Sequence, residues 1–315
     1  GFQSALMAPT EILAEQHYST LRSITENSGI KCALLTGSQS KKQKNEIKAA
    51  LKSGETDLAV GTHALLTDDV EFDRLGLVIT DEQHRFGVAQ RAKLSAKGDN
   101  PHTLVMSATP IPRTLGLIIY GDLDISVIDE YPRGRQVIDT YLVNSSYHKR
   151  IYSYIKKFLD SGRQGYIVCP LVEENEALEI TSASEYYEPL RDGDFSGYSL
   201  GLLHGKMPAR EKESVMRRFA AGELQLLIST TVIEVGIDVP NAVVMVIENA
   251  ERFGLSQLHQ LRGRIGRGEY KSVCILVSDS ASEETRRRLN VIKNCRDGFK
   301  IADEDLKLRG PGDFL

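Results

Sequence analysis

The stretch Leu75-Gly76-Leu77-Val78-Ile79-Thr80-Asp81-Glu82-Gln83-His84 joins a continuous apolar run to two adjacent carboxylates. Such a run is typical of a strand that is buried on both faces of a parallel sheet. Ligands of open α/β sheets bind beyond the carboxyl ends of the strands, which is where Asp81 and Glu82 would lie. An acid there could hold Mg²⁺, and its neighbour could orient and deprotonate a water molecule. The pair by itself favours the start of a solvated loop, because Asp and Glu are common in loops, so the functional interpretation depends on further motifs.

Similar apolar runs recur along the chain in two series of six, which we expect to be strands of parallel sheets. The first series is Ser4–Ala8, Cys32–Thr36, Asp57–Gly61, Leu75–Thr80, Thr103–Ser107 and Ile125–Ile128. The second is Val137–Val143, Gly165–Leu171, Ser199–His204, Leu224–Ser229, Ala242–Glu248 and Ser272–Ser278. Amphipathic stretches separate the runs, and residues that favour helix starts or ends punctuate them: Thr10, Gly29, Ser40, Gly54 and Pro208. The sequence therefore predicts an α/β protein with two parallel-sheet domains in tandem.

The segment from Tyr131 to Arg135 contains both Pro132 and Gly134 and is the predicted linker between the two domains. We place the first domain at residues 1–131 and the second at 136–280. Residues 281–315 are highly charged and are predicted to be helical from Ser282 to Cys295. This last segment is therefore expected to be an appended helical element rather than part of a sheet.

Composition narrows the class of protein. Of the 315 residues, 41% are hydrophobic and 26% are charged, as in ordinary globular proteins. We see no apolar run of the ~18 residues that a membrane span needs, and no signal peptide at the start, where the chain looks cut from something longer. The four cysteines lie far apart, which favours reduced thiols in the cytoplasm over zinc or disulfides. The net charge of −4 argues weakly against nucleic acid, but local basic patches exist.

The most informative of these patches is Gln260-Leu261-Arg262-Gly263-Arg264-Ile265-Gly266-Arg267-Gly268, in which arginines and glycines alternate. Glycine lets the backbone approach a ligand closely, and guanidinium groups make bidentate contacts with phosphate oxygens. The alternative, a basic surface helix that merely touches nucleic acid, explains this regular spacing less well. The motif therefore predicts contacts with phosphates.

Small hydroxyl-bearing turns follow several of the predicted strands. Ser107-Ala108-Thr109 is either a capped turn or a segment that changes its hydrogen-bond partners when a nucleotide is hydrolysed. Thr10, Thr62 and Thr230 each stand between a predicted strand and a predicted helix, where hydroxyls and free N–H groups can bind a backbone phosphate. These turns add a second set of candidate phosphate contacts.

The order of these motifs resembles that of the superfamily 2 helicases. Within them, Asp81–Val88, Ala108–Leu115 and Tyr120–Asp124 resemble the RecG family of bacterial ATP-dependent DNA helicases. The tail, from Asp297 to Asp313, resembles the translocation motif that this family shares with the transcription-repair coupling factor. The resemblance covers essentially the whole chain. It implies two RecA-like domains, ATP and Mg²⁺ as cofactors, and an enzyme that remodels stalled forks and Holliday junctions.

The resemblance also implies roles for individual residues. Asp81 would hold Mg²⁺, through water, and Glu82 would activate the attacking water, while Gln260, Arg264 and Arg267 would reach the phosphates across a cleft. Nucleotide state would be sensed by His84, Ser107, Ala108, Thr109, Gly236 and Asp238. DNA would run along Pro9, Thr10, Gly37, Thr62 and Thr230. The implied partners are double-stranded and branched DNA and a single-stranded DNA-binding protein, for a monomeric motor in the bacterial cytoplasm, away from membranes.

The sequence departs from the family in two respects. It contains no G-x-x-x-x-G-K-[ST] phosphate loop and no wedge domain, so we expect an incomplete first domain that binds ATP poorly and hydrolyses little. Two alternatives stay open: a translocase of the coupling-factor type, against which Gln83 and Gln90–Lys93 argue, and a DNA-binding module without catalysis. The retained Asp81, Glu82, Arg264 and Arg267 argue against the second. A stand-alone metal hydrolase is remote, because no further ligands accompany the carboxylates.

Overall fold

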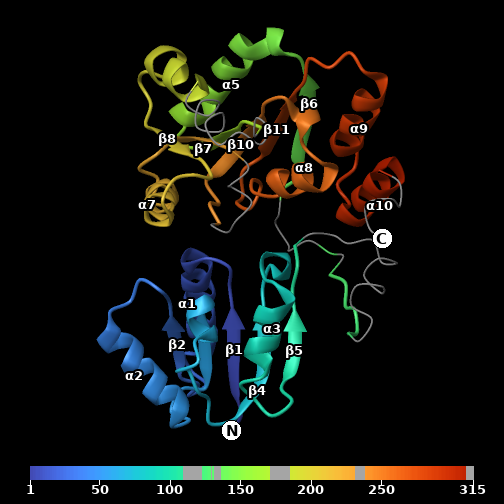
Figure 1. Cartoon of the computed structure of the whole chain (residues 1–315). Coiled ribbons are helices and arrows are strands. Elements are labelled where there is room, and N and C mark those ends of the chain that lie inside the picture. Colours follow the sequence, from blue (N-terminus) through green and yellow to red (C-terminus); the bar gives the residue numbers. More distant parts are fainter. Residues whose placement is uncertain (109–122, 129, 131–135, 171–184, 231–237, 310–315) are drawn as a thin grey trace. The chain divides into compact units, whose positions relative to one another are not determined.

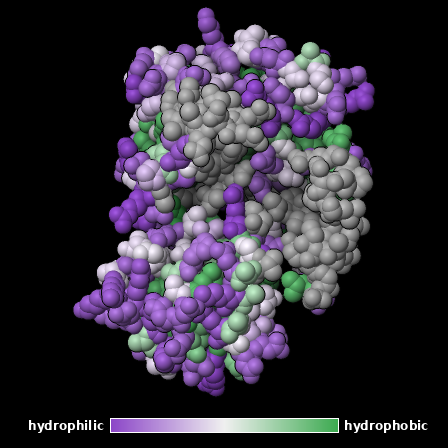
Figure 2. Space-filling model, in the orientation of Figure 1, coloured by the Kyte–Doolittle hydropathy of each residue, from purple (hydrophilic) through white to green (hydrophobic). Residues whose placement is uncertain are grey.

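The computed structural model describes residues 1–108, 123–128, 130, 136–170, 185–230 and 238–309 (Figure 1). Contacts between Cα atoms divide the chain into two compact units, the first built on Gly1–Ala108 and the second on described residues of 109–234 and 238–315. The predicted linker lies outside the described residues, and the domain boundaries stay a prediction. Hydrophilic side chains cover much of the visible surface of both units (Figure 2). No helix in the described ranges combines the length and the apolar character that crossing a bilayer requires.

The first unit is a five-stranded parallel sheet in the order β2-β3-β1-β4-β5. Its strands are β1 (Gln3–Met7), β2 (Cys32–Leu35), β3 (Leu58–Gly61), β4 (Leu75–Thr80) and β5 (His102–Val105). Its helices are α1 (Glu11–Thr25), α2 (Lys41–Lys52) and α3 (Val88–Ser95), with short 3₁₀ turns η1 (His63–Leu66) and η2 (Gln83–Arg85). Five of the six predicted strands of this series are confirmed, within a residue or two at their ends.

Apolar side chains of the sheet alternate between two cores. Ala14, Leu13 and Tyr18 of α1 pack on one face against Leu6 and Val60. The helices α2 and α3 supply Leu51 and Leu94 to the core on the opposite face. The apolar side of α1 thus anchors the helix to this face, where it contacts the strands β2 and β3.

Local capping signals define the helix starts as expected. The Thr10 hydroxyl accepts the N–H of Leu13 at 3.3 Å and begins α1. Ser40 and Gln43 form a reciprocal capping box at the start of α2, and Gly54, at φ +75°, follows its end.

The sixth predicted strand of the first series, Ile125–Ile128, is wrong. These residues belong to no strand, and the side chains of Ile125, Val127 and Ile128 are exposed, the last at 91%. A run of apolar residues becomes a buried strand only where a sheet edge is available to pair with it. In the described part of the first unit, the sheet ends at β5.

The second unit is a six-stranded parallel sheet in the order β6-β11-β10-β7-β9-β8, and all six predicted strands are confirmed. They are β6 (Ile138–Val143), β7 (Gln164–Val168), β8 (Leu200–Leu203), β9 (Leu226–Ser229), β10 (Ala242–Ile247) and β11 (Ser272–Val277). The helices with described bounds are α5 (His148–Asp160), α7 (Ala209–Ala220), α8 (Leu255–Arg262), α9 (Glu283–Asn294) and α10 (Gly298–Arg309). Shorter turns are η3 (Ser145–Tyr147), the π-helical η4 (Leu190–Asp194) and η6 (Ala250–Arg252). The two-domain parallel α/β architecture is thus confirmed.

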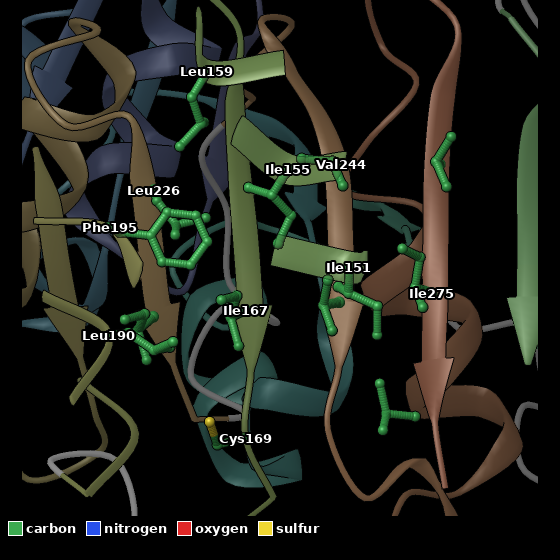
Figure 3. Packing of buried hydrophobic residues seen from close by; sticks show 14 residues of the cluster. Ile151, Ile155, Leu159, Ile167, Cys169, Leu190, Phe195, Leu226, Val244 and Ile275 are labelled. Atoms are coloured by element: carbon green, nitrogen blue, oxygen red, sulfur yellow. The ribbon is translucent and has the colours of Figure 1, made fainter. Parts of the chain in front are cut away.

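One face of the second sheet is covered by α5. Its Ile151, Ile155 and Leu159 lie against side chains from the central strands, among them Ile167 and Val244 (Figure 3). On the charged tail, α9 contacts β6 and α8, and α10 contacts α8 and α9. The predicted helix from Ser282 to Cys295 is confirmed as α9, with those two residues as its caps.

Candidate functional site

The acid pair lies where the sequence predicts, directly beyond the carboxyl end of β4. The N–H of Asp81 donates to the carbonyl of Met7 at 3.0 Å, which keeps Asp81 in register with the neighbouring β1. Its carboxylate is held from two sides: Oδ2 lies 2.7 Å from His17 Nε2, and Oδ1 accepts the N–H of Glu82 at 2.8 Å. The side chain is nevertheless 19% exposed, so a ligand can still approach this fixed carboxylate.

Glu82 has a left-handed backbone, with φ 49° and ψ 51°. This conformation is uncommon for residues other than glycine, and such residues cluster at functional sites. The next residue, Gln83, is buried, and its N–H donates to the carbonyl of Met106, whose own N–H donates to Thr80. These two backbone hydrogen bonds place Ser107 and Ala108 next to the acid pair, as a nucleotide sensor would require.

The predicted DNA residues of the first unit gather at the carboxyl ends of three neighbouring strands. Pro9 and Thr10 follow β1, Gly37 follows β2 and Thr62 follows β3. The N–H of Thr62 donates to the carbonyl of Leu35 at 3.3 Å, which joins two of these strand ends. One edge of the sheet therefore holds these hydroxyl-bearing turns over β2, β3 and β1, and the acids over β4.

Glu11 fixes the loop after β2. Its Oε1 accepts the N–H of Ser38 at 2.9 Å, and a Cβ on Gly37 would lie only 2.9 Å from the same oxygen. The Lys44 ammonium donates to the Gly37 carbonyl at 2.5 Å. Glycine at position 37 thus leaves room for the Glu11 carboxylate, and a larger residue would require the end of that flexible side chain to shift.

The second unit repeats this construction between residues 203 and 230, whose numbers exceed those of residues 35–62 by 168 without a gap. Gly205 takes the place of Gly37, and Lys212 donates to its carbonyl as Lys44 does in the first unit. Thr230 takes the place of Thr62, and its N–H donates to Leu203 at 3.1 Å. Sequence reasoning found Thr230 but missed Gly205. The signal was present, because Gly54-Glu55 and Gly222-Glu223 stand in the same register within the chain.

A second internal match joins residues 81–90 to 248–257, with numbers raised by 167. Arg85-Phe86-Gly87 corresponds to Arg252-Phe253-Gly254. Asn249 shares the left-handed backbone of Glu82, and Gln257 shares the capping hydrogen bond of Gln90. The two units are therefore similar in local sequence as well as in their alternation of strands and helices. Sequence reasoning did not detect the similarity in local sequence.

The arginines of the Arg-Gly motif have different surroundings. Arg262 is 4% exposed; its guanidinium donates to the carbonyl of Ile292 in α9 and contacts His259 Nδ1 at 3.1 Å, so it joins α8 to α9. Arg267 is partly exposed, its Nη1 lies 3.5 Å from Asp238 Oδ1 and its Nε donates to the Gly263 carbonyl.

Arg264 and Arg267 both act electrostatically on the buried Tyr166. Burial raises the pKa of the Tyr166 hydroxyl, the positive charges of Arg264 and Arg267 oppose the rise, and Asp238 adds to it. The charges of two predicted phosphate-binding arginines and of the predicted sensor Asp238 therefore all act on one buried hydroxyl. Gln260 lies on α8, half-buried, four residues before Arg264.

Some predicted site residues cannot be placed. Thr109 and Gly236 lie outside the described residues, as does the side chain of His84. Their roles stay predictions.

The donor set suits a magnesium ion that arrives with a nucleotide. Mg²⁺ is typically held by one or two carboxylates together with waters and substrate phosphates. Asp81 offers such a carboxylate at an accessible strand end. Within the described ranges, no group of three or more His, Cys, Asp or Glu could enclose a metal by itself. The carboxylate of Asp81 therefore fits a Mg²⁺ that reaches the site together with a nucleotide.

Comparison with known families supports the helicase resemblance. Residues 1–118 match the DEAD/DEAH box helicase family. Residues 150–269 match the helicase conserved C-terminal domain.

Curated relatives match the chain over its whole length. ATP-dependent DNA helicase RecG of Bacillus subtilis is 53% identical over 315 residues, which is 100% of this chain and 46% of that protein. The RecG helicase of Thermotoga maritima is 52% identical over 315 residues, which is 100% of this chain and 40% of that protein. The chain thus spans less than half the length of these relatives.

Solved structures agree. RecG bound to a three-way DNA junction superimposes with a TM-score of 0.86 at 49% identity, covering 100% of this chain and 41% of that one. Mss116p bound to single-stranded RNA and AMP-PNP superimposes with a TM-score of 0.68 at 20% identity, covering 98% of this chain and 66% of that one. The second likeness concerns the fold alone.

Proposed function

This chain belongs to the superfamily 2 helicases of the RecG type, and on that basis we propose that it is the motor part of an ATP-dependent DNA helicase that remodels branched DNA. The observation that carries the proposal is the similarity, over the whole length of this chain, to parts of relatives named ATP-dependent DNA helicase RecG. The likeness to RecG bound to a three-way junction supports branched DNA as the substrate.

In the first unit, Asp81 and Glu82 serve the nucleotide. Asp81 holds Mg²⁺, which when bound neutralises charge on the phosphate oxygens. Glu82 takes the proton of the attacking water. Its backbone N–H donates to Asp81 Oδ1, and this hydrogen bond fixes the position from which the Glu82 side chain extends. Ser107 and Ala108, bound to the same loop through Met106, report the nucleotide state to the end of β5.

In the second unit, Arg264 and Arg267 stabilise the charge that develops on the transferred phosphoryl group, and Gln260 assists them. The ion pair of Arg267 with Asp238 keeps that guanidinium in place until a phosphate is bound. Guanidinium pairs with phosphate more strongly than with a single partly exposed carboxylate, so the exchange is favourable.

DNA is bound by the strand-end turns of both units. Thr10, Gly37 and Thr62 supply hydroxyl and backbone contacts to phosphates from the first unit, and Thr230 does so from the second. Pro9 shapes the turn before Thr10. A single-stranded DNA-binding protein as partner, a monomeric state and the bacterial cytoplasm as location follow from the same proposal.

The test is ATP hydrolysis in the presence of a three-way junction. The assay uses this chain joined to the preceding segment of its Bacillus subtilis relative, which is expected to supply the phosphate loop that this sequence lacks. Glu82→Gln should lower kcat by ~10²–10⁴-fold, because it removes the general base while keeping the shape of the side chain.

The matched control is Glu71→Gln, a neutralised glutamate that pairs with Lys52 on the surface, 57% exposed. It should leave kcat unchanged. Undiminished turnover in Glu82→Gln would refute the role given to Glu82. DNA binding without any hydrolysis in the wild type would instead favour the module without catalysis.

A further inference from the structure

His17 is a residue of α1 that sequence reasoning did not single out, and it contacts the predicted magnesium ligand. Its Nε2 lies 2.7 Å from Asp81 Oδ2 across 64 positions of sequence. An ionised carboxylate only accepts hydrogen bonds, so Nε2 is the donor. Because the other oxygen already accepts the Glu82 N–H at 2.8 Å, the two bonds together fix the plane of the carboxylate.

The helix that presents His17 is itself firmly placed. Ala14, one turn before His17, is fully buried, and Leu13 and Tyr18 pack in the same core. At its start, the hydroxyl of Thr10 caps the helix, and Glu11 is bonded to the loop after β2. His17 lies six residues beyond Glu11, which is roughly 9 Å along the axis. One rigid helix therefore connects the predicted DNA loops to the predicted magnesium ligand.

We propose that His17 is a positioning residue that holds the Asp81 carboxylate in the orientation needed to bind a divalent cation. The inference rests on the proposed function only in that it takes Asp81 as the cation ligand. Hydrogen-bonded partners of a ligating carboxylate orient it, and their loss typically weakens metal binding by ~10–100-fold. The Asp81 side chain is buried enough to be fixed and exposed enough to be reached.

The second unit contains a matched pair that serves as a control. His148 Nε2 lies 3.0 Å from Glu248 Oε2, but this carboxylate is only 2% exposed. In the match of residues 81–90 with 248–257, Glu248 corresponds to Asp81. The same kind of hydrogen bond is thus present at a carboxylate that is closed to a cation, so replacing His148 tests for general effects of losing a histidine.

The first experiment measures cation binding by the full chain with Mn²⁺ alone, through paramagnetic broadening of the Asp81 and Glu82 amide signals. His17→Leu should need ~10–100-fold more Mn²⁺ for the same broadening. His17→Gln, which keeps an N–H donor of similar reach, should restore most of the affinity, and His148→Leu should leave it unchanged. Equal or tighter binding by His17→Leu would overturn the proposal.

The second experiment compares crystal structures of the wild type, His17→Gln and His17→Leu. The carboxylate of Asp81 should keep its orientation in the first two and lose it in the third. An unchanged carboxylate in His17→Leu would overturn the proposal whatever the cation does. If Mn²⁺ broadens neither amide in the wild type, Asp81 binds no cation in the absence of a nucleotide, and these crystal structures still decide whether His17 positions it.

Discussion

Replacing the buried Gln164 by leucine should destabilise the second unit, because its side chain joins three segments at the start of β7. Its Nε2 donates to the carbonyl of Phe219 at 2.6 Å and to that of Leu224 at 2.7 Å. Its Oε1 accepts from Asn241 at 3.2 Å. The amide thus links the end of α7 and the start of β9 to the central strand.

The expected loss in the free energy of unfolding depends on which hydrogen bonds each partner of Gln164 keeps after the replacement. The Phe219 carbonyl also accepts the N–H of Gly222 at 3.0 Å, and Asn241 also donates to Gly162, so both keep a partner. The carbonyl of Leu224, at a residue only 2% exposed, has the Gln164 amide as its partner. One orphaned buried carbonyl and one weakened one together cost about 2–4 kcal/mol of the free energy of unfolding.

The first unit offers an independent repetition. Gln3 donates to Leu51 and Thr56 at 2.9 and 2.7 Å and accepts the N–H of Arg74 at 3.1 Å. The Leu51 carbonyl again keeps another partner, Gly54, at 3.2 Å. Gln3→Leu should therefore cost its own unit the same amount as Gln164→Leu costs the second.

The assay is urea unfolding followed by far-UV circular dichroism, with hydrogen exchange of the β7 and β9 amides to assign the affected transition. The control is Gln257→Leu, which removes one exposed capping bond to Gly254 and should cost at most about 1 kcal/mol. A loss of less than about 1 kcal/mol for Gln164→Leu would refute the reasoning, since a buried carbonyl without a partner costs at least that much.

Two further predictions concern titratable groups. The hydrogen bond to Glu248 raises the pKa of His148 above its ordinary 6.5, so this bond stabilises the fold most fully below that pH and less as pH rises through the higher folded pKa. The Tm difference between the wild type and His148→Gln should therefore shrink as pH increases; a difference that grows would contradict this. Burial raises the pKa of the Cys274 thiol to about 12 and that of the Cys169 thiol further still, so both should resist iodoacetamide in the native chain. The partly accessible thiols of Cys32 and Cys295 should react, and mass spectrometry of the alkylated peptides would identify the modified residues. Rapid labelling of either protected thiol would contradict the assignment.

The sequence by itself determined the elements and the two-domain parallel α/β class. Eleven of the twelve predicted strands are present, because a continuous apolar run bounded by turn residues encodes a buried strand locally. Thr10 and Ser40 begin helices as predicted, since a cap depends only on residues three positions away. The place of Asp81 and Glu82 was likewise readable, because whatever follows an apolar strand lies at its carboxyl end.

Only the tertiary structure decided which of these residues meet. The contact of His17 with Asp81 depends on the order β3-β1-β4 and on the face that α1 covers, neither of which is written in any short stretch. Similarly, the alternation of arginines with glycines could not distinguish Arg262, which is buried against α9, from the partly exposed Arg267. Ile125–Ile128 failed as a strand for the same reason: an apolar run supplies a strand's side chains, but a hydrogen-bonding partner comes from elsewhere in the chain.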